Sequence, residues 1–496
     1  MSHKQDHSEL VDKILTGARW ATVLRLAAQV FSWLSTIIVV RFISPEDYGL
    51  NTMLESPLVL MMLLSTLGLD AALVQAKNIE PEELQSIFGW LLILNGILFL
   101  CYFFGGAVLA SYFNEPRLDL LAKALAFIFL LVPFRVVPNA LLDRQLDFKL
   151  RAQLEITATV AAAAVTLALA YSGAGVWALV TGVIVSKLLL SILLMIFMPW
   201  FIVPKFNLAT TGRMLSTGGI ITLGGAFLLL SDMLITLVAG PKLGSALLGV
   251  FAVGAQFASL PLAKGMPIIN QTMLPAFARF QEHRSSATYY LEKLLGVSSL
   301  AFVPMMTGMA CMADTLVLTV LGAKWAPSIF PLVMMSLGMI FRMNNLLLKT
   351  AMTSMGRADL SLRSNFLQPV LLLPMTVYAI EYGVIGLAVA WVATELLVML
   401  VTVQLSKQAF DTSFMRLLRC YRPALVSATI MGGCVIGIKA LLGNQTSMAV
   451  FFIAIATGIV SYYLATRLLF LAELQTVLKT IFGNRLAFLA PRRSQS

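Results

Sequence analysis

The sequence predicts an all-α, polytopic membrane protein with fourteen transmembrane helices: two pseudo-symmetric six-helix bundles followed by two C-terminal helices. The first observation is composition, because 59% of the 496 residues are hydrophobic and only 12% are charged, far from the balance of soluble domains. The second is that the apolar residues fall into segments near the roughly 20 residues that a helix needs to cross the hydrocarbon core. The third is that the connections between these segments alternate in basic content.

A hydropathy window of about 19 residues divides the chain into these spans. The first six cover residues 19–42, 49–75, 86–111, 118–142, 154–172 and 175–201. After the polar stretch VPKFNLATTGR, six more cover residues 214–239, 246–276, 293–320, 327–352, 364–380 and 384–406. The last two cover residues 421–442 and 447–467. The predicted domains are therefore residues 1–213, 214–410 and 411–496, the last of which includes a basic tail.

The distribution of basic residues predicts the orientation in the membrane. Of the 35 Lys and Arg residues, 23 fall on the side of the N-terminus, 4 on the opposite side and 8 within spans. Because basic connections stay in the cytoplasm, both termini are expected there. The net charge of +11 then reflects topology and contact with anionic lipid, and no motif of a nucleic-acid-binding domain accompanies it. The prediction is a multi-pass protein with no nucleic-acid partner.

The two six-span sets contain matching segments in the same order. PFRVVPN, beginning at residue 133, matches IFRMNNL, beginning at residue 340, and the match pairs Arg135 with Arg342. GVWALVTGVIVSKLL matches GVIGLAVAWVATELL, which pairs Lys187 with Glu395. Gly49 of DYGLNTM likewise matches the glycine of LLGVFAV. An even number of spans per repeat keeps both halves the same way up, so we expect a pseudo-two-fold axis along the membrane normal and a ligand site between the halves.

Charged residues within the predicted spans are the candidate functional residues. A charge near the bilayer centre costs on the order of 3 kcal/mol even on the insertion scale, so each needs water or a partner. The cations are Arg25, Lys123, Arg135, Lys187, Lys264, Arg342, Lys349 and Lys439, and the carboxylates at comparable depth are Glu55, Asp70, Asp232, Asp314 and Glu395. Lys123, Lys349 and Lys439 lie near predicted span ends, where long side chains reach the interface. Lys349 also stays a candidate because its end is the predicted cytoplasmic mouth.

Arg135 and Arg342 recur at one repeat position, beside residues that weaken helices. One hypothesis is a buried ion pair, with Asp232 or Glu55 as the partner. The other is a pair of guanidiniums facing a wet central cavity and matched to an anion, because the donors of arginine suit phosphate oxygens. Lys264 would join them from span 246–276, whose prolines predict a bent helix.

No catalytic pattern is present, so the chain is not expected to be an enzyme. All three histidines lie in predicted cytoplasmic segments, and no phosphate-binding loop, nucleophile elbow or HExxH motif occurs. The four cysteines share no metal-ligand spacing, so neither a metal nor a cofactor is expected. Coupling to an ion would depend on carboxylates.

The coupling candidates are Glu55, Asp70, Asp232 and Glu395, with Lys187 as the repeat counterpart of Glu395. For each carboxylate the alternative is a structural ion pair. If Lys187 and Glu395 both faced the central cleft, they could attract one another in one state and separate in the other. If each faced its own bundle, both would be structural.

Several segments resemble the bacterial polysaccharide-export flippases. They are NALLDRQLDFKLRAQLEI, GAGVWALVTG, SPEDYG, SDMLITLVAGPKLGSALLGVFAVG and VLGAKWAPS. The likeness runs from about residue 10 to 410 and is greatest to the Wzx-type members of colanic-acid and exopolysaccharide clusters. These flippases belong to the superfamily that also includes the multidrug extruders. Two further C-terminal helices also fit these flippases.

The resemblance implies a two-lobed, alternating-access carrier in the bacterial inner membrane. Such a carrier flips undecaprenyl-diphosphate-linked oligosaccharide through a cationic cavity, with membrane lipids and possible polysaccharide polymerase machinery as partners. Arg135 and Arg342 lie where such flippases carry cavity charges, and the resemblance also makes Lys264 and Arg25 candidates for that cavity, although interior charges vary among members. The alternative is a cation-coupled drug antiporter, which would favour an acidic or aromatic cavity.

Overall fold

The computed structural model describes residues 31, 35–69, 73, 80–145, 147–198, 203–206, 208–278, 280, 283–443 and 447–475. The chain separates into two compact units, Met1–Gly249 and Val250–Ser496. Every regular element in the described ranges is a helix, so the predicted all-α class is confirmed. The predicted domain boundaries after residues 213 and 410 stay predictions.

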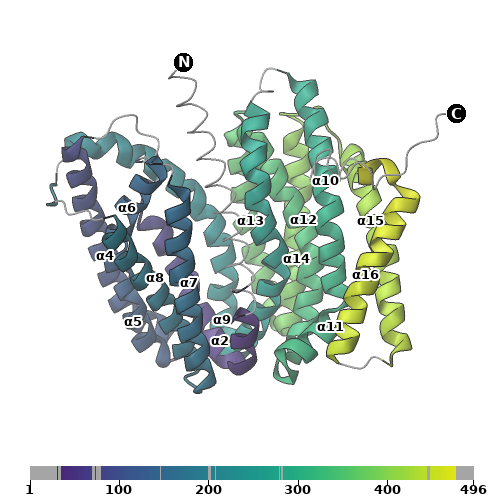
Figure 1. The fold of residues 1–496 in the computed structure, drawn as a ribbon, viewed down its shortest axis with the longest axis horizontal. Coiled ribbons are helices and arrows are strands. Elements are labelled where there is room, and N and C mark those ends of the chain that lie inside the picture. The colour runs from purple at the N-terminus through teal and green to yellow at the C-terminus, as the bar shows by residue number, and fades with distance from the viewer. Residues whose placement is uncertain are drawn as a thin grey trace, which may run out of the picture. The chain divides into compact units, whose positions relative to one another are not determined.

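The first unit contains long helices that pack side by side (Figure 1). They are α2 (Pro45–Leu64), α4 (Pro81–Phe113), α5 (Arg117–Leu131), α6 (Pro133–Arg144), α7 (Phe148–Tyr171), α8 (Val176–Phe197) and the first part of α9 (Leu208–Ala278). Helix α4 packs on α5, α7 packs on α8, and α8 also contacts α5 and α6. Helices α6 and α7, which carry most of the charged residues of the site described below, therefore contact α8.

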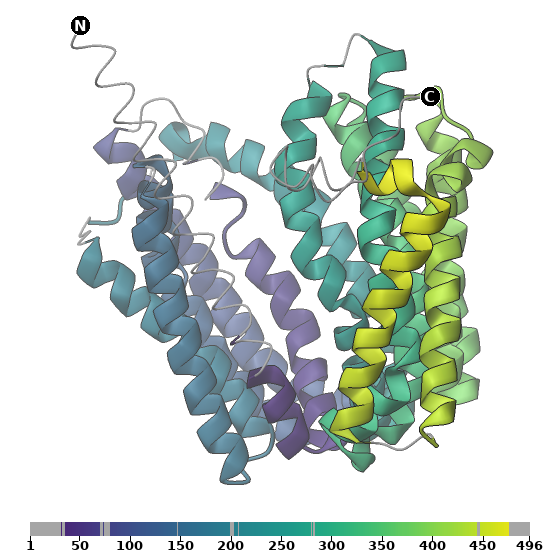
Figure 2. The same cartoon turned by 45° about the vertical axis from the view of Figure 1, so that its right-hand side comes forward.

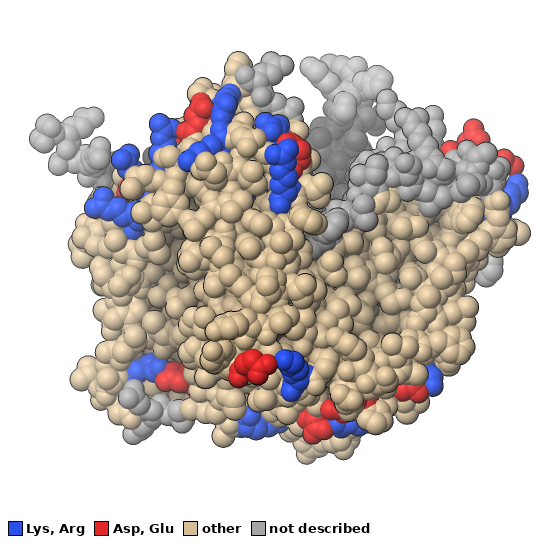
Figure 3. All heavy atoms as spheres, turned by 180° about the vertical axis from the view of Figure 1, so that it is seen from behind, with Lys and Arg blue, Asp and Glu red and all other residues tan. Residues whose placement is uncertain are grey.

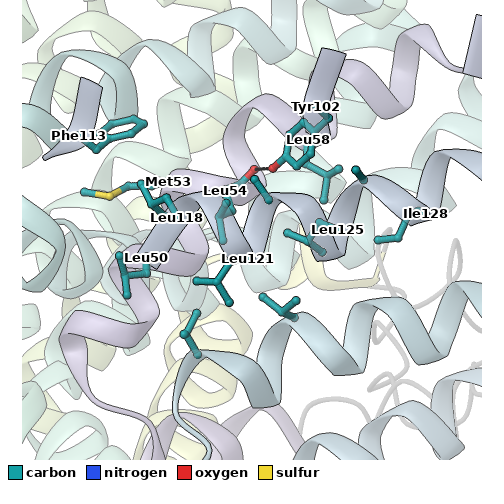
Figure 4. Close-up of a cluster of buried hydrophobic side chains, with 14 of the residues drawn as sticks. Leu50, Met53, Leu54, Leu58, Tyr102, Phe113, Leu118, Leu121, Leu125 and Ile128 are labelled. Atoms are coloured by element: carbon teal, nitrogen blue, oxygen red, sulfur yellow. Dashed lines mark hydrogen bonds between the residues drawn. The ribbon is translucent and has the colours of Figure 1, made fainter. Parts of the chain in front are cut away.

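The core of the first unit is a cluster of aliphatic and aromatic side chains from α2, α4 and α5 (Figure 4). Leu54 and Leu121 are almost completely buried there. The Tyr102 hydroxyl donates a 2.8 Å hydrogen bond to the carbonyl oxygen of Leu54, so this buried polar group is satisfied. By contrast, Phe104 and Val108 are exposed on α4, and an exposed apolar surface on a spanning helix suits contact with lipid.

The predicted fourth span is bent. Helices α5 and α6 meet at Val132 with an angle of 42° between them. Pro133 lies directly after the break and has no amide hydrogen to donate, which explains why the helix bends at this position. The bend precedes Arg135 by less than one turn, so this guanidinium lies at the start of a redirected helix.

Helix α9 continues for 71 residues and changes direction at a glycine. Gly244 has φ 75° and ψ 174°, a conformation outside the helical region that glycine adopts without a Cβ penalty. It lies at the end of GPKLG, the connection that the sequence predicts between the spans 214–239 and 246–276. The predicted separation of two spans here is therefore visible as a local break in the helix.

The second unit is a further set of packed helices (Figure 2). They are α10 (Arg284–Cys311), the short α11 (Ala313–Leu316), a π-helical turn Val317–Leu321, a 3-10 turn Ala323–Ser328, α12 (Ile329–Ser354), α13 (Ala358–Ala379), a 3-10 turn Ile380–Tyr382, α14 (Gly383–Ser406), α15 (Phe414–Leu441) and α16 (Met448–Leu469). Helix α12 contacts α13 and α14, whereas α15 packs between α10 and α16. Met431 and Ala454 belong to the buried cluster that joins the last two helices.

The helices have the length and apolarity of membrane spans. In the described part of the chain, nine helical segments qualify, or ten if the bent pair α5 and α6 is one span. Two of these segments, Leu229–Asn270 and Ala358–Ser406, are 42 and 49 residues long, about twice the length that one crossing requires. On the face drawn in Figure 3, charged side chains gather toward the helix ends and the band between them is mostly uncharged. The chain is thus a multi-pass membrane protein, and the count of fourteen stays a prediction.

Candidate functional site

A polar cavity of about 690 Å³ lies within the first unit, where α6, α7 and α8 provide most of its lining. Arg135, Asn139 and Asp143 line it from α6, and their four-residue spacing puts them on one face of that helix. Arg151 and Glu155 line it from α7 with the same spacing. The periodicity of two neighbouring helices therefore directs five polar side chains into one space.

Arg151 links the two carboxylates of this cavity. Its guanidinium forms an ion pair with Asp143 on α6, and its Nε atom donates a 2.9 Å hydrogen bond to Oε1 of Glu155. The Arg151 side chain is 29% exposed and the side chains of Asp143 and Glu155 are 23% and 36% exposed, so solvent weakens these bonds only in part. One cation is thus engaged with two anions and ties α6 to α7.

Lys187 enters the same cavity from α8 and adds a further positive charge. It is partly buried, and it is repelled by Arg135 and attracted by Glu155. Among the described residues, no carboxylate forms an ion pair with Lys187. Arg135 has further interactions of its own. The like charges of Arg135 and Lys187 therefore line one space.

The second unit contains a buried carboxylate with several donors. Glu395 on α14 has a side chain only 2% exposed. Its Oε1 accepts a 3.3 Å bond from Nη1 of Arg342 and a 3.1 Å bond from Nε2 of Gln368, and its Oε2 accepts a 3.0 Å bond from Nδ2 of Asn345. Because a buried carboxylate requires both a countercharge and hydrogen bonds, this set satisfies Glu395.

Two further side chains complete this network. The Arg342 guanidinium lies 5.8 Å from the ring centroid of Trp391, a cation–π contact. Lys349, about two helical turns after Arg342 on α12, is buried and interacts electrostatically with both Glu395 and Arg342. Lys349 therefore lies inside the second unit. The expectation that its side chain reaches an interface as a snorkelling lysine is wrong, because packing encloses it.

The sequence repeats align position 135 with 342 and position 187 with 395, and the two positions of each unit contribute to the same cluster. Arg135 and Lys187 line one cavity in the first unit, and Arg342 and Glu395 form an ion pair in the second. Glu395 is thus a carboxylate partner of Arg342, and the hypothesis of an ion pair with Asp232 or Glu55 stays a prediction. The hypothesis that Glu395 faces Lys187 across a central cleft also stays a prediction.

Three other predicted site residues that the structure describes, Lys264, Asp232 and Glu55, do not line the first-unit cavity. Lys264 and Asp232 are exposed on α9, and Asp232 has interactions of its own. Glu55 is exposed on α2 and accepts a 3.2 Å hydrogen bond from Asn51. Arg25 and Asp70 lie outside the described residues. Roles for these five positions in binding or coupling stay predictions.

Two other cations predicted within spans have carboxylate partners. Lys123 pairs with Asp119, one turn earlier on α5, at 2.7 Å. Lys439 on α15 is buried, pairs with Asp314 and donates a 3.0 Å hydrogen bond to the carbonyl oxygen of Cys311. These pairs join neighbouring turns or helices, as expected for structural charges in a membrane protein.

Sequence reasoning missed several members of both clusters. The predicted spans place Asp143 and Arg151 in the connection between residues 142 and 154, and Glu155 is not among the predicted site residues, although the spacing of Arg151 and Glu155 is that of a helical ion pair. Asn345 and Gln368 were not proposed as ligands of a carboxylate. No local signal reveals them, because both bonds to Glu395 join different helices.

The fold and the charge clusters define a multi-pass membrane protein with polar sites among its helices. Residues 38–330 match the family described as polysaccharide biosynthesis protein. The match covers more than half of the chain, which therefore belongs to this family. The predicted resemblance to polysaccharide-export flippases is confirmed.

Relatives and solved structures agree with this assignment. The chain is 25% identical to the lipopolysaccharide biosynthesis protein WzxC of Escherichia coli (strain K12), over 78% of this chain and 80% of WzxC. It is 23% identical to the teichuronic acid biosynthesis protein TuaB of Bacillus subtilis (strain 168), over 71% of this chain and 73% of TuaB. The lipid II flippase MurJ, in an inward closed conformation, has the same fold, with a TM-score of 0.71 at 13% identity over 90% of this chain and 98% of MurJ.

A second solved structure shares the fold more distantly. An inward-facing multidrug resistance transporter of the MATE family and MOP superfamily has a TM-score of 0.58 at 15% identity, over 81% of this chain and 99% of that protein. At such identities the likeness establishes the architecture alone, and the choice of substrate depends on the residues of this chain.

Proposed function

We propose that this protein flips undecaprenyl-diphosphate-linked oligosaccharide repeat units across the bacterial inner membrane for polysaccharide export. The observation that carries the proposal is membership of the polysaccharide biosynthesis family over residues 38–330. The relative ExoT of Rhizobium meliloti is named a succinoglycan biosynthesis transport protein. This name supports transport as the step that our protein contributes to biosynthesis. MurJ, which shares the fold, is a flippase of a lipid-linked substrate.

The residues that line the cavity of the first unit support the proposal of an anionic and strongly polar substrate. It is lined by three cations, Arg135, Arg151 and Lys187, and by two carboxylates, Asp143 and Glu155. Its volume of about 690 Å³ falls in the range of small-molecule sites. Guanidinium and ammonium groups compensate phosphate charges inside a membrane, where an uncompensated anion is costly. The cavity accordingly favours a phosphate-bearing substrate over an organic cation.

Alternating access through a cationic cavity is the mechanism that we propose. Two sequence repeats with the same orientation support it, because such repeats can rearrange around a shared axis. The substrate's diphosphate would enter the cavity as its sugars are moved away from the cytoplasmic face. Both termini are proposed to be cytoplasmic, and polysaccharide polymerase machinery is a proposed receiver of the flipped product.

The alternative is a cation-coupled drug antiporter. It would need a cavity dominated by carboxylates or aromatic rings, whereas the cavity of the first unit has more cations than carboxylates. We therefore retain the flippase as the proposed function.

The test is to delete the gene and follow lipid-linked oligosaccharide in the two leaflets. The proposal predicts that undecaprenyl-diphosphate-linked material accumulates on the cytoplasmic face and that surface polysaccharide is lost, with both reversed by the intact gene. Spheroplasts treated with a glycan-specific probe distinguish material on the outer face from total material. Normal surface polysaccharide in the deletion strain, together with altered drug sensitivity, would favour the antiporter instead.

A further inference from the structure

We propose that the second unit has a binding site for a resident phospholipid, phosphatidylethanolamine. Its headgroup lies in a charged pocket between α10 and α15, and its acyl chains lie in an apolar groove along α16. No residue that lines either space is among the predicted site residues. The inference goes beyond the proposed function, because it concerns a membrane lipid that stays with the protein rather than the substrate that is moved.

The headgroup pocket has a volume of about 400 Å³ and lies between two packed helices. Its charged lining residues are Glu292 and Lys293 on α10, Arg416 and Arg419 on α15, and Glu473 beyond the end of α16. Arg416 and Arg419 are three residues apart, so they share one face of α15. The pocket therefore presents three cations and two carboxylates to one ligand.

These charges lie at the depth of lipid headgroups. The predicted spans 293–320 and 421–442 begin beside the pocket residues of α10 and α15, and the predicted span 447–467 ends six residues before Glu473. Basic residues at span ends lie near lipid phosphates, and basic pockets between membrane helices bind phospholipid headgroups. The side chains of Arg416 and Arg419 are exposed, so a phosphate in the surrounding membrane has access to them.

An apolar groove of about 660 Å³ adjoins the headgroup pocket, and Leu300 lines both spaces. Along α16 the lining runs from Phe451 to Thr466, which is about 22 Å of helix at 1.5 Å per residue. This length exceeds the roughly 15 Å depth of the hydrocarbon in one leaflet. The Tyr462 hydroxyl donates a 2.8 Å hydrogen bond to the carbonyl oxygen of Leu300, so this polar group is satisfied and leaves the groove suited to hydrocarbon.

Glycines leave room for a ligand in both spaces. A Cβ atom on Gly296, in the headgroup pocket, would lie 3.9 Å from the carbonyl oxygen of Cys420, an ordinary contact distance. Gly308 and Gly458 line the groove, and a Cβ atom on either would also meet its neighbours at ordinary distances. Small residues at these positions are thus not required by close helix packing, and larger side chains there would take up space in the pocket or the groove.

The carboxylates select the kind of headgroup. The Oε1 atom of Glu292 is buried and has no hydrogen-bond partner among the described residues, which is unfavourable without a donor. The ammonium of phosphatidylethanolamine supplies both a countercharge and N–H donors for Glu292, while its phosphate suits Lys293 and Arg419. Phosphatidylcholine has the same two charges but no N–H donor. Phosphatidylglycerol and undecaprenyl phosphate have no cation for the carboxylates.

The experiment titrates the full-length protein, purified in detergent, with four lipids and counts bound lipid by native mass spectrometry. They are phosphatidylethanolamine, phosphatidylcholine and phosphatidylglycerol with identical acyl chains, and undecaprenyl phosphate. Because a charge-assisted hydrogen bond to Glu292 is lost with phosphatidylcholine, we expect phosphatidylethanolamine to bind roughly 10-fold more tightly. Glu292→Gln should remove most of that difference. Arg419→Gln should weaken the binding of both lipids, because both have the phosphate.

Two matched pairs of variants control for changes in charge and in volume. Arg422→Gln removes an exposed arginine of α15 that does not line the pocket, and it should leave affinity unchanged. Gly296→Leu should fill the headgroup pocket and lower the affinity for phosphatidylethanolamine. Gly433→Leu, at a position of α15 where a Cβ meets nothing within 4 Å, should not. The thermal unfolding midpoint of each variant identifies losses of affinity that come from misfolding.

Three results would overturn the inference. Equal affinity of the wild type for phosphatidylethanolamine and phosphatidylcholine would mean that the lipid is held as any surrounding lipid is. Tighter binding of phosphatidylglycerol would make the site selective for anionic lipid. Tighter binding of undecaprenyl phosphate, lost in Gly296→Leu, would assign the site to the carrier of the substrate. None of these results decides the flippase proposal, which the deletion strain tests separately.

Discussion

Gly49 and Gly249, which match in the two sequence repeats, lie directly against one another in the first unit. A Cβ atom on Gly249 would lie 2.8 Å from the amide nitrogen of Gly49 and would overlap the carbonyl oxygen of Pro45. A Cβ atom on Gly49 would overlap the carbonyl oxygen of Ser245. The start of α2 thus approaches the second part of α9 through backbone atoms on both sides, in the manner of small-residue contacts between membrane helices.

The first prediction concerns this glycine contact. Gly249→Val should separate α2 from α9, because its side chain would overlap backbone atoms that cannot move aside as a flexible side chain could. Overpacking costs about 1–3 kcal/mol, so we expect a lower thermal unfolding midpoint and reduced export. Gly96→Ala on α4 is the control, since a Cβ there meets nothing within 4 Å. Equal stability of the two variants would show that the contact is unimportant.

The second prediction concerns the ion pair between Arg342 and Glu395. Arg342→Ala leaves a carboxylate without its countercharge in a site that is almost fully buried. Breaking such a pair costs about 3–5 kcal/mol, so the yield of folded protein and the unfolding midpoint should fall. The double variant Arg342→Ala, Glu395→Gln should recover a large part of the loss, because the remaining amide has no charge. No recovery in the double variant would contradict this account.

The third prediction concerns ion coupling. Glu395 is bonded to Arg342, Gln368 and Asn345, which gives it a structural role. Transport by Glu395→Gln in reconstituted vesicles, measured against external pH, should therefore have the same profile as the wild type, although the variant is less stable. A profile that loses its pH dependence in this variant would instead make Glu395 the coupling group.

The fourth prediction concerns Arg135. Because this side chain is partly exposed at a polar cavity, Arg135→Ala should cut export at least 10-fold while the amount of folded protein in the membrane changes little. Arg135→Lys should restore export only in part, since an ammonium lacks the planar fork that contacts two phosphate oxygens. Parallel immunoblots of membrane fractions give the protein amounts. Wild-type export by Arg135→Ala would remove this residue from the mechanism.

The sequence by itself determined the class of fold, most span positions and the internal repeat. These features depend on properties that are local in the chain. Hydropathy is summed over neighbouring residues, and the bend at Pro133 follows from a missing amide hydrogen. The pairing of Arg135 with Arg342 and of Lys187 with Glu395 also needed only alignment of one half with the other.

Only the tertiary structure decided which charges are satisfied within the protein and which face a cavity. Glu395 meets Arg342 across 53 residues of sequence and Gln368 across 27, and both bonds depend on which faces of the helices pack together. In a membrane, a polar side chain needs water or a hydrogen-bonding partner on whichever side of its helix it lies. Hydropathy does not record the side of the helix on which a residue lies. The same repeat position therefore became a closed ion pair in one unit and part of a cationic cavity in the other.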